Sequence, residues 1–224
     1  MLAAIDAESP DELWCLGDLV GYGPRPNRCC RLVAARASAC LAGNHDLGVL
    51  GVEPLEVFSP DAAVAARWSS EVLETDERAW LAGLKPLLRR DDAELYHASP
   101  RDPIWDYVLS EDAAAESLAL TQAPVVLVGH SHVPLALAVD NGGVVGGVAG
   151  DGAEVDLAGT RWLLNPGSVG QPRDGDRRAA WLLLDLNAGR ASFRRVEYPV
   201  AETQREIHER GLPELLATRL ARGQ

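Results

Sequence analysis

The sequence lacks any apolar run of about 20 residues, which is the length that a membrane-spanning helix requires. Residues 1–6 also lack the basic start and long apolar core of a secretory signal peptide. These two absences argue against a membrane protein and against secretion by the signal-peptide route. We therefore expect a cytoplasmic protein without a membrane partner.

An excess of basic residues is also missing, since 21 Lys and Arg stand against 33 Asp and Glu, for a formal net charge of −12. Proteins that bind nucleic-acid polymers usually neutralise phosphates with a basic face, so this class is disfavoured. The charge does not exclude phosphate chemistry, because bound divalent cations would reverse its sign locally. We expect a small phosphate ester as the substrate.

Two motifs that a chain of this kind could carry are absent. The four cysteines, Cys15, Cys29, Cys30 and Cys40, show no C-x-x-C spacing, which predicts reduced and mostly buried thiols. The glycine-rich segment 142–152 is not followed by Gly-Lys-Ser/Thr, so it predicts a flexible hairpin and not a P-loop.

The composition is that of a soluble globular protein, with 47% hydrophobic and 24% charged residues. A chain of 224 residues can bury one full core, and no internal repeat or low-complexity linker divides it. We predict a single domain over residues 1–224.

Hydrophobic patterning predicts alternating helices and strands in the first half of the chain. Residues 1–6 are typical of the end of a helix, and strands are predicted at 12–17, 38–42, 93–97 and 125–128. Helices are predicted at 27–37, 59–73, 75–88 and 110–121, with caps at Asn27, Ser59, Thr75 and Ser110.

The pattern changes after His132, where short strands follow one another at hairpin spacing. They are predicted at 135–139, 144–148, 154–157, 161–164, 180–186 and 192–198. Residues 199–222 close the chain as an amphipathic helix, whose stripe of Leu212, Leu215, Leu216 and Leu220 we expect to pack on a sheet. The whole pattern favours two mixed sheets packed face to face with helices outside.

Five polar residues come after apolar strands by one to three positions: Asp18, Asn44, His97, His130 and His132. In open α/β sheets such residues gather beyond the carboxyl ends of the strands. Carboxylate, amide and imidazole groups together suit Mn²⁺, Fe or Zn²⁺. An aspartate can also bridge two such ions, about 3.5–4 Å apart, which then clamp a phosphoryl group during displacement.

Each of these segments has a simpler interpretation when it is taken alone. A lone histidine such as His97 is usually a core residue, and Gly-Asn at position 44 is ordinary turn chemistry. His130 and His132 could share one face of a strand, or lie in an irregular loop from which both approach a metal. Their joint occurrence favours the metal site.

The order of Gly17-Asp18, Gly43-Asn44-His45-Asp46, His97 and Gly129-His130-Ser131-His132 resembles that of the calcineurin-like metallophosphoesterases. Segments 17–24 and 165–173 are similar to those of its small bacterial single-domain branch. The resemblance spans nearly the whole chain, and it implies a four-layer αββα sandwich, the metallophosphoesterase fold, with a dinuclear metal site.

Carried over by position, the resemblance makes Asp18 the carboxylate that bridges two divalent ions. Asn44, His97 and His130 would complete the ligand set of the first ion, and His132 would bind the second ion. Mn²⁺ is the expected metal, with Fe, Zn²⁺ or Ni²⁺ as alternatives. A metal-bridging hydroxide would attack phosphorus.

The resemblance also implies two catalytic residues. His45 would protonate the leaving alkoxide or contact the phosphate, and Asp46 would hold the imidazole of His45 in register. No substrate-binding residue is assigned: Arg173 and Asp174 could line the site, but a solvated turn is an equal alternative.

One motif of the family is missing. Family members begin with a strand carrying Asp-x-His, which supplies two further ligands to the ion held by His132, whereas the first histidine here is His45. The first strand of the fold is therefore expected to be absent, through either an internal start or a real loss. We expect the chain as written to be unstable or weakly active, and an upstream-extended form to be the working protein.

The sequence leads to two hypotheses of function. The first is a metal-dependent phosphoesterase that hydrolyses phosphomonoesters or phosphodiesters, which the presence of His45 and Asp46 favours. The second is a non-catalytic scaffold with the same fold and an incomplete metal centre, which the missing Asp-x-His favours. The sequence leaves the substrate and the oligomeric state open.

Overall fold

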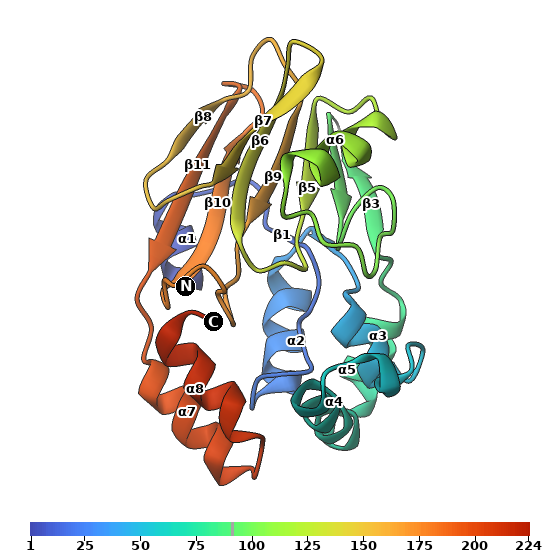
Figure 1. The fold of residues 1–224 in the computed structure, drawn as a ribbon. Coiled ribbons are helices and arrows are strands. Elements are labelled where there is room, and N and C mark those ends of the chain that lie inside the picture. Colours follow the sequence, from blue (N-terminus) through green and yellow to red (C-terminus); the bar gives the residue numbers. More distant parts are fainter. Residues whose placement is uncertain (91) are drawn as a thin grey trace.

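A computed structural model describes residues 1–90 and 92–224 of the chain (Figure 1). Its helices are α1 Leu2–Ala7, α2 Pro26–Arg36, α3 Asn44–Leu50, α4 Pro60–Val72, α5 Thr75–Ala82, α6 Glu111–Ala119, α7 Val200–Glu209 and α8 Glu214–Arg222, with a 3₁₀ turn η1 at Leu55–Val57. Its strands are β1 Trp14–Cys15, β2 Ala39–Cys40, β3 Leu87–Arg90, β4 Ala93–Tyr96, β5 Val125–Val128, β6 Pro134–Asp140, β7 Gly143–Val148, β8 Glu154–Asp156, β9 Trp162–Pro166, β10 Ala179–Asp185 and β11 Arg190–Val196.

The largest sheet has six strands in the order β3-β4-β5-β9-β6-β7. Strands β4, β5 and β9 run parallel, and the strands on either side of them pair antiparallel, so the sheet is mixed. A second layer of strands consists of two pieces, the parallel pair β1-β2 and the antiparallel sheet β10-β11-β8.

Strand β5 shows how the layers pack, because alternate side chains of a strand point to opposite faces. Val125 and Leu127 lie in a core with residues of β2, β8 and β11, whereas Val126 and Val128 lie in a core with α6. The six-stranded sheet is therefore covered by strands on one face and by a helix on the other. Mixed sheets flanked by helices were expected from the sequence, and this fold is confirmed.

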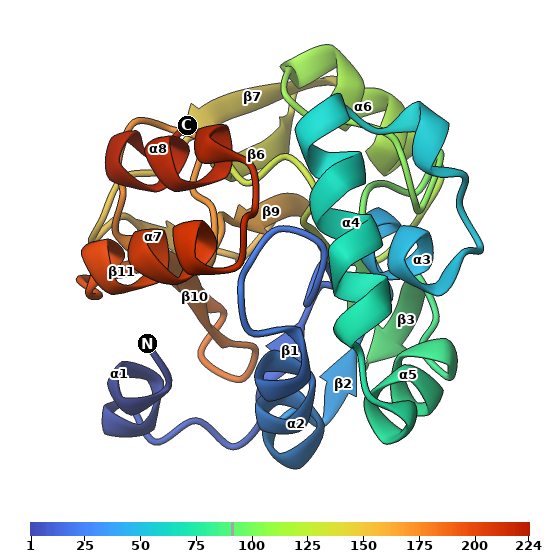
Figure 2. The same cartoon turned by 90° about the horizontal axis from the view of Figure 1, so that it is seen from below.

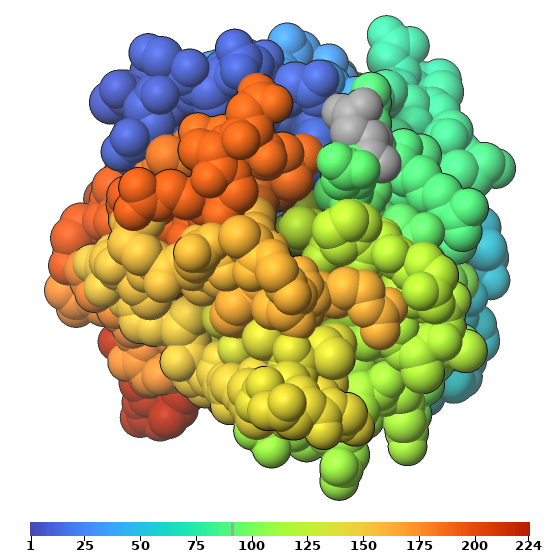
Figure 3. Space-filling view, turned by 90° about the horizontal axis from the view of Figure 1, so that it is seen from above, coloured from blue at the N-terminus to red at the C-terminus, as the bar shows by residue number. Residues whose placement is uncertain are grey.

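Six helices, α2, α3, α4, α5, α7 and α8, lie at one end of the strands (Figures 1 and 2). Helices α2, α3, α4 and α5 share one apolar core, and α7 and α8 pack together and against α4 in another. Figure 3 shows the opposite end of the molecule, where segments of the β-hairpins form the surface. Within residues 1–90 and 92–224, no helix has the length and apolar character needed to cross a bilayer.

The C-terminal segment differs from its prediction as one helix that packs on a sheet. Gly211, with φ of +65°, and Pro213 separate α7 from α8, because neither residue continues a helix readily. Leu212, Leu216 and Leu220 pack against α4 and not against a sheet. Leu215 is not part of this core, because 48% of its surface is exposed.

Two further helix predictions were wrong. The helix predicted at 75–88 ends at Ala82, and residues 87–90 form β3, because Gly83 and Pro86 lie between the two elements. Asn27 does not cap α2, since Pro26 is already its first residue. The Asn27 side chain instead bonds the Val72 carbonyl at 2.8 Å and the Glu74 N–H at 2.9 Å.

The predicted caps had mixed outcomes. Ser110 does cap α6, where its hydroxyl accepts the Ala113 N–H at 3.2 Å. Ser59 occupies the cap position of α4 without a side-chain bond, and Thr75 is already the first residue of α5. The four cysteines are free, and Cys30 is buried while Cys29 is exposed.

Candidate metal centre

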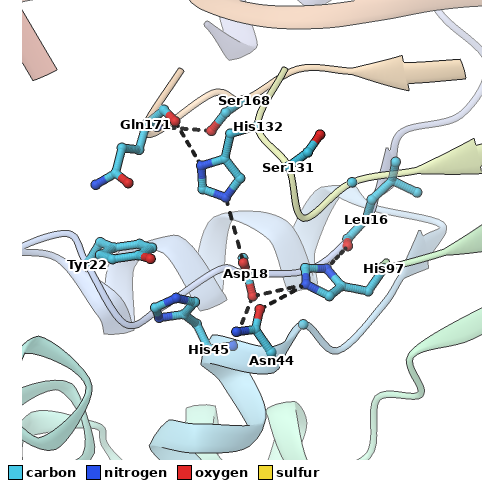
Figure 4. A network of polar contacts seen from close by, with 12 residues as sticks. Leu16, Asp18, Tyr22, Asn44, His45, His97, Ser131, His132, Ser168 and Gln171 are labelled. Carbon is cyan, nitrogen blue, oxygen red and sulfur yellow. Dashed lines mark hydrogen bonds and ion pairs between the residues drawn. The ribbon is translucent and has the colours of Figure 1, made fainter. Parts of the chain in front are cut away.

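The five residues predicted to bind metal come from four separate segments of the chain, and Figure 4 shows four of them, Asp18, Asn44, His97 and His132, close together. Asp18 follows β1, Asn44 is the first residue of α3, His97 follows β4, and His130 and His132 lie between β5 and β6. Ligand atoms of Asp18, His97 and His130 all lie within 4.8 Å of one another. The convergence follows from the parallel pairs β1-β2 and β4-β5, whose carboxyl ends face the same region.

Backbone turns of unusual geometry bring these side chains inward. Asp18, His130 and His132 have backbone φ values of +56°, +57° and +60°, which residues other than glycine rarely adopt. Gly17 precedes Asp18 with φ of +95°, and a Cβ there would lie 2.6 Å from the Gly43 nitrogen. Positive φ at three non-glycine residues around one point is the kind of strain found at functional sites.

His97 presents a bare ring nitrogen to the centre of the site. Its Nδ1 lies 2.7 Å from the Leu16 carbonyl oxygen, which can only accept, so Nδ1 carries the proton. In the neutral ring, Nε2 then points a lone pair at Asn44 Oδ1, 3.2 Å away, and at Asp18 Oδ1, 3.5 Å away. Three acceptor atoms facing one another repel unless a cation lies between them.

His132 lies on the other side of the Asp18 carboxylate. Its Nδ1 is 2.8 Å from the Gln171 carbonyl oxygen, which fixes the tautomer, and its Nε2 is 3.8 Å from Asp18 Oδ2. Asp18 Oδ2 and His130 Nε2 are buried and have no hydrogen-bond partner in the described residues. A carboxylate, an amide oxygen and imidazole nitrogens form a donor set that fits a divalent cation of the Mn, Fe or Zn kind.

The local electrostatics favour these groups as ligands. Burial raises the pKa of the Asp18 carboxyl, but the imidazole of His97, a hydrogen bond from His132 and the imidazole of His45 outweigh it: each imidazole that becomes protonated favours the ionised carboxylate, so the pKa of Asp18 lies well below its usual range. Burial lowers the pKa of His130 to about 4, with a further contribution from the charge of His97. An ionised carboxylate beside a neutral imidazole is the protonation state that metal binding requires.

Asp46 was predicted to hold the imidazole of His45, and the structure contradicts this. Each of its two carboxylate oxygens accepts two backbone N–H groups, at 2.8–3.1 Å, from Asp18, Leu19, Val20 and Gly43. The Nδ1 of His45 has no partner in the described part of the chain. Asp46 therefore fixes the loop that carries Asp18, because all its acceptor positions face backbone.

His45 is held by aromatic packing and not by a carboxylate. The ring of Tyr22 lies 4.0 Å from it and the ring of Phe58 lies 5.0 Å from it, centroid to centroid. Burial lowers the pKa of His45 to about 4. Its backbone N–H donates to Asp18 Oδ1 at 3.0 Å, so the start of α3 also orients the candidate metal ligand.

Several residues around the site were not predicted from the sequence. Asn165, at the end of β9, donates from Nδ2 to the Gly129 carbonyl at 2.8 Å and to Ser131 Oγ at 2.9 Å, which pins the loop that carries His130 and His132. Segment 165–173 resembles the corresponding segment of the family, but its local sequence does not indicate what the Asn165 amide contacts. Tyr107 stacks on His130 at 4.1 Å, and nothing in its sequence neighbourhood signals it.

Comparisons with known proteins agree with this arrangement. A family model described as the calcineurin-like phosphoesterase superfamily domain matches residues 1–189. An uncharacterised protein of Methanocaldococcus jannaschii is 33% identical over 95% of this chain and 86% of its own. A symmetrical bis(5′-nucleosyl)-tetraphosphatase of Nitrosococcus oceani is 36% identical over 52% of this chain and 43% of that enzyme.

Solved structures resemble the whole chain. The crystal structure of a metallophosphoesterase from Sphaerobacter thermophilus is 40% identical, with a TM-score of 0.88 over 100% of this chain and 93% of its own. A hypothetical protein of Pyrococcus horikoshii OT3 shares the fold at 19% identity, with a TM-score of 0.78.

Proposed function

The chain belongs to the calcineurin-like phosphoesterase superfamily, and on that premise we propose that it hydrolyses small phosphate esters with bound divalent metal. The observation that carries this proposal is the meeting of Asp18, Asn44 and His97, whose acceptor atoms face one another at 3.2–3.5 Å. Such a group is costly without a cation and stable with one.

Asp18, Asn44, His97 and His130 would hold one ion, and Asp18 and His132 would contribute to a second. Bound at this position, divalent metal supplies Lewis-acid activation of phosphoryl oxygen and of water. We propose Mn²⁺ as the native metal, as the sequence predicts, with Fe, Zn²⁺ and Ni²⁺ as the alternatives to compare.

His45 is the residue that we propose to act on the substrate. Its Nδ1 is buried, its ring is wedged between Tyr22 and Phe58 beside Asp18, and its Nε2 makes no hydrogen bond within the described residues. It can therefore contact a phosphoryl oxygen or pass a proton to the leaving alkoxide without first breaking another hydrogen bond. Asp46 supports the reaction only indirectly, by fixing the loop of Asp18.

Neither monoesters nor diesters are favoured by these residues alone. The relative from Nitrosococcus oceani is named for a bis(5′-nucleosyl)-tetraphosphate substrate, which supports a nucleotide-like phosphate here as a proposal. From the sequence, we also propose that residues 1–224 form a single domain and that the protein is cytoplasmic.

The test combines metal analysis with hydrolysis of a generic bis-aryl phosphate. Protein stripped by a chelator and reconstituted with Mn²⁺ is compared with His97→Ala, His45→Ala and a control, His208→Ala, whose half-exposed ring pairs with Glu214 far from the site. We expect His97→Ala to lose metal, and His45→Ala to keep metal and lose about 10²–10⁴-fold in rate. Equal rates in all four proteins would contradict the proposal, and bound metal without hydrolysis would favour the scaffold.

A further inference from the structure

Arg173 lies beside the candidate metal centre, which is one of the two alternatives that its sequence left open. Its backbone N–H donates to the His132 carbonyl at 3.2 Å. This bond ties the segment after β9 to the loop that carries two of the proposed metal ligands. Of the two alternatives, Arg173 therefore lies next to the site and not in a solvated turn.

The guanidinium of Arg173 contacts only neutral groups. Its Nη2 lies 3.1 Å from the Tyr22 hydroxyl and 3.1 Å from Gln171 Oε1. Its Nε is buried without a hydrogen-bond partner, and no carboxylate of residues 1–90 or 92–224 forms an ion pair with it. The terminal Nη1 also makes no hydrogen bond within the described residues, so the outer edge of a permanently charged group is left without a partner.

Nearby arginines show how unusual this is. Arg178 pairs with Asp176 and Asp151, and Arg195 pairs with Asp174, the residue next to Arg173. Acidic partners are abundant in a protein with a net charge of −12. A partly buried cation without a counterion costs stability, so its presence beside the candidate metal centre points to an anion that binds there.

The anion would lie next to the reacting group and not in its place. Tyr22 separates the guanidinium from His45: its ring is 4.0 Å from the His45 ring, and Arg173 Cζ lies 5.9 Å from the Tyr22 centroid. Tyr22 is also near His132, at 6.4 Å between centroids. Arg173 thus stands one aromatic ring beyond the residue proposed to act on the scissile phosphate.

We propose that Arg173 and the Tyr22 hydroxyl bind a second phosphoryl group of the substrate, so that the preferred substrates are phosphoric anhydrides with two adjacent phosphoryl groups. This inference rests on the proposed phosphoesterase function. Arginine suits the role because its planar fork pairs with two phosphoryl oxygens at once. In the reaction, water adds to one phosphorus, the bond to the bridging oxygen breaks, and that oxygen leaves with the electron pair and later takes a proton.

The first test measures binding alone, with inorganic pyrophosphate and inorganic phosphate as probes in calorimetry on metal-free protein. We expect wild type to bind pyrophosphate at least ten-fold more tightly than phosphate, and Arg173→Gln to lose this preference. Arg177→Gln removes the same charge from an exposed position in the same segment and serves as the matched control. A preference that survives in Arg173→Gln, or is absent in wild type, would overturn the inference.

The second test separates this inference from the proposed function. In Mn²⁺-loaded protein, the loss of kcat/KM in Arg173→Gln should be at least ten times larger for an aryl diphosphate than for an aryl monophosphate, and Arg173→Lys should recover only part of it. Equal losses for both substrates would contradict the second phosphoryl site. If wild type hydrolyses neither of these compounds nor the bis-aryl phosphate, the proposed function fails, while the binding experiment still decides the role of Arg173.

Discussion

Asp46 is the residue whose role changes most between sequence and structure. Burial raises the pKa of its carboxyl, and the charge of Asp18 adds to the rise, while four backbone N–H donors oppose it. Only an ionised carboxylate offers acceptors to all four donors, because a protonated oxygen would point its hydrogen at an N–H group. The side chain is thus part of the framework of the Asp18 loop.

Replacement of this carboxylate by an amide should therefore weaken the fold. We expect Asp46→Asn to lower the free energy of unfolding by about 2–3 kcal/mol, because an amide NH₂ would face backbone donors that lose their acceptor. Urea unfolding measures the change, and Asp11→Asn, at an exposed position, should shift it by less than about 0.5 kcal/mol. Unchanged stability with lost activity would restore the predicted role of Asp46 in orienting His45.

At the scale of elements, the loop between β5 and β6 depends on the end of β9. Asn165 is fully buried, and its side chain joins the Gly129 carbonyl, Ser131 Oγ and the Gly167 N–H, the last at 2.9 Å from Oδ1. One amide thus links β9 to the loop that positions His130 and His132.

Loss of this amide should disturb both stability and metal binding. We expect Asn165→Ala to cost about 2–3 kcal/mol, since it leaves buried groups unpaired, and Ser131→Ala to cost about 1 kcal/mol. Both changes should also weaken Mn²⁺ affinity in calorimetric titration, in the same order. Asn187→Ala, in an exposed turn, is the control. A reversed order, or stability loss with unaltered metal affinity, would contradict the pinning role.

Helix α7 is joined to the loop before α2 by an ion pair. Arg25 Nε donates to Glu206 Oε2 at 2.6 Å, and its Nη2 donates to Glu202 Oε1 at 2.7 Å. The hydrogen bond from Arg25 lowers the pKa of Glu206 below its ordinary value. Because the pKa is lower in the folded state, the pair stabilises the fold above the unfolded pKa and loses this effect as the pH falls through the folded pKa.

The sign of this linkage gives a pH-dependent expectation. We expect Glu206→Gln to reduce the free energy of unfolding by about 1 kcal/mol at pH 7, a discounted figure because Arg25 is partly exposed. The difference from wild type should shrink as the pH is lowered below the ordinary glutamate range. Glu209→Gln, which removes an exposed helix pair with Arg205, should show little change at any pH. A difference that grows on acidification would disprove the assignment.

At the scale of the whole molecule, metal binding should be linked to folding. The proposed ligands come from four segments between residues 18 and 132, so an ion that joins them stabilises only the folded chain. We expect Mn²⁺ at 100 times its dissociation constant to add about 2.7 kcal/mol and to raise the melting temperature by several degrees. Chelation should reverse the shift, which should be absent in His97→Ala and present in His208→Ala.

Much of the fold could be predicted from periodicity, and the site could be predicted from the polar residues directly after the strands. The hairpin strands and the α6 cap at Ser110 arise from local signals. The sequence did not reveal that Asp46 serves backbone N–H groups, that Asn165 pins the histidine loop, or that Arg173 lacks a counterion in the described residues. Each of these depends on contacts between segments far apart in the chain, which no local pattern encodes.

The central claim is that Asp18, Asn44, His97 and His130 share one divalent ion. Anomalous X-ray scattering from crystals grown with Mn²⁺ tests it most directly, because it locates the metal without reference to activity. We expect an anomalous peak bonded to Asp18 Oδ1, Asn44 Oδ1, His97 Nε2 and a ring nitrogen of His130. A fully occupied Mn²⁺ elsewhere, with no peak among these four side chains, would contradict the account.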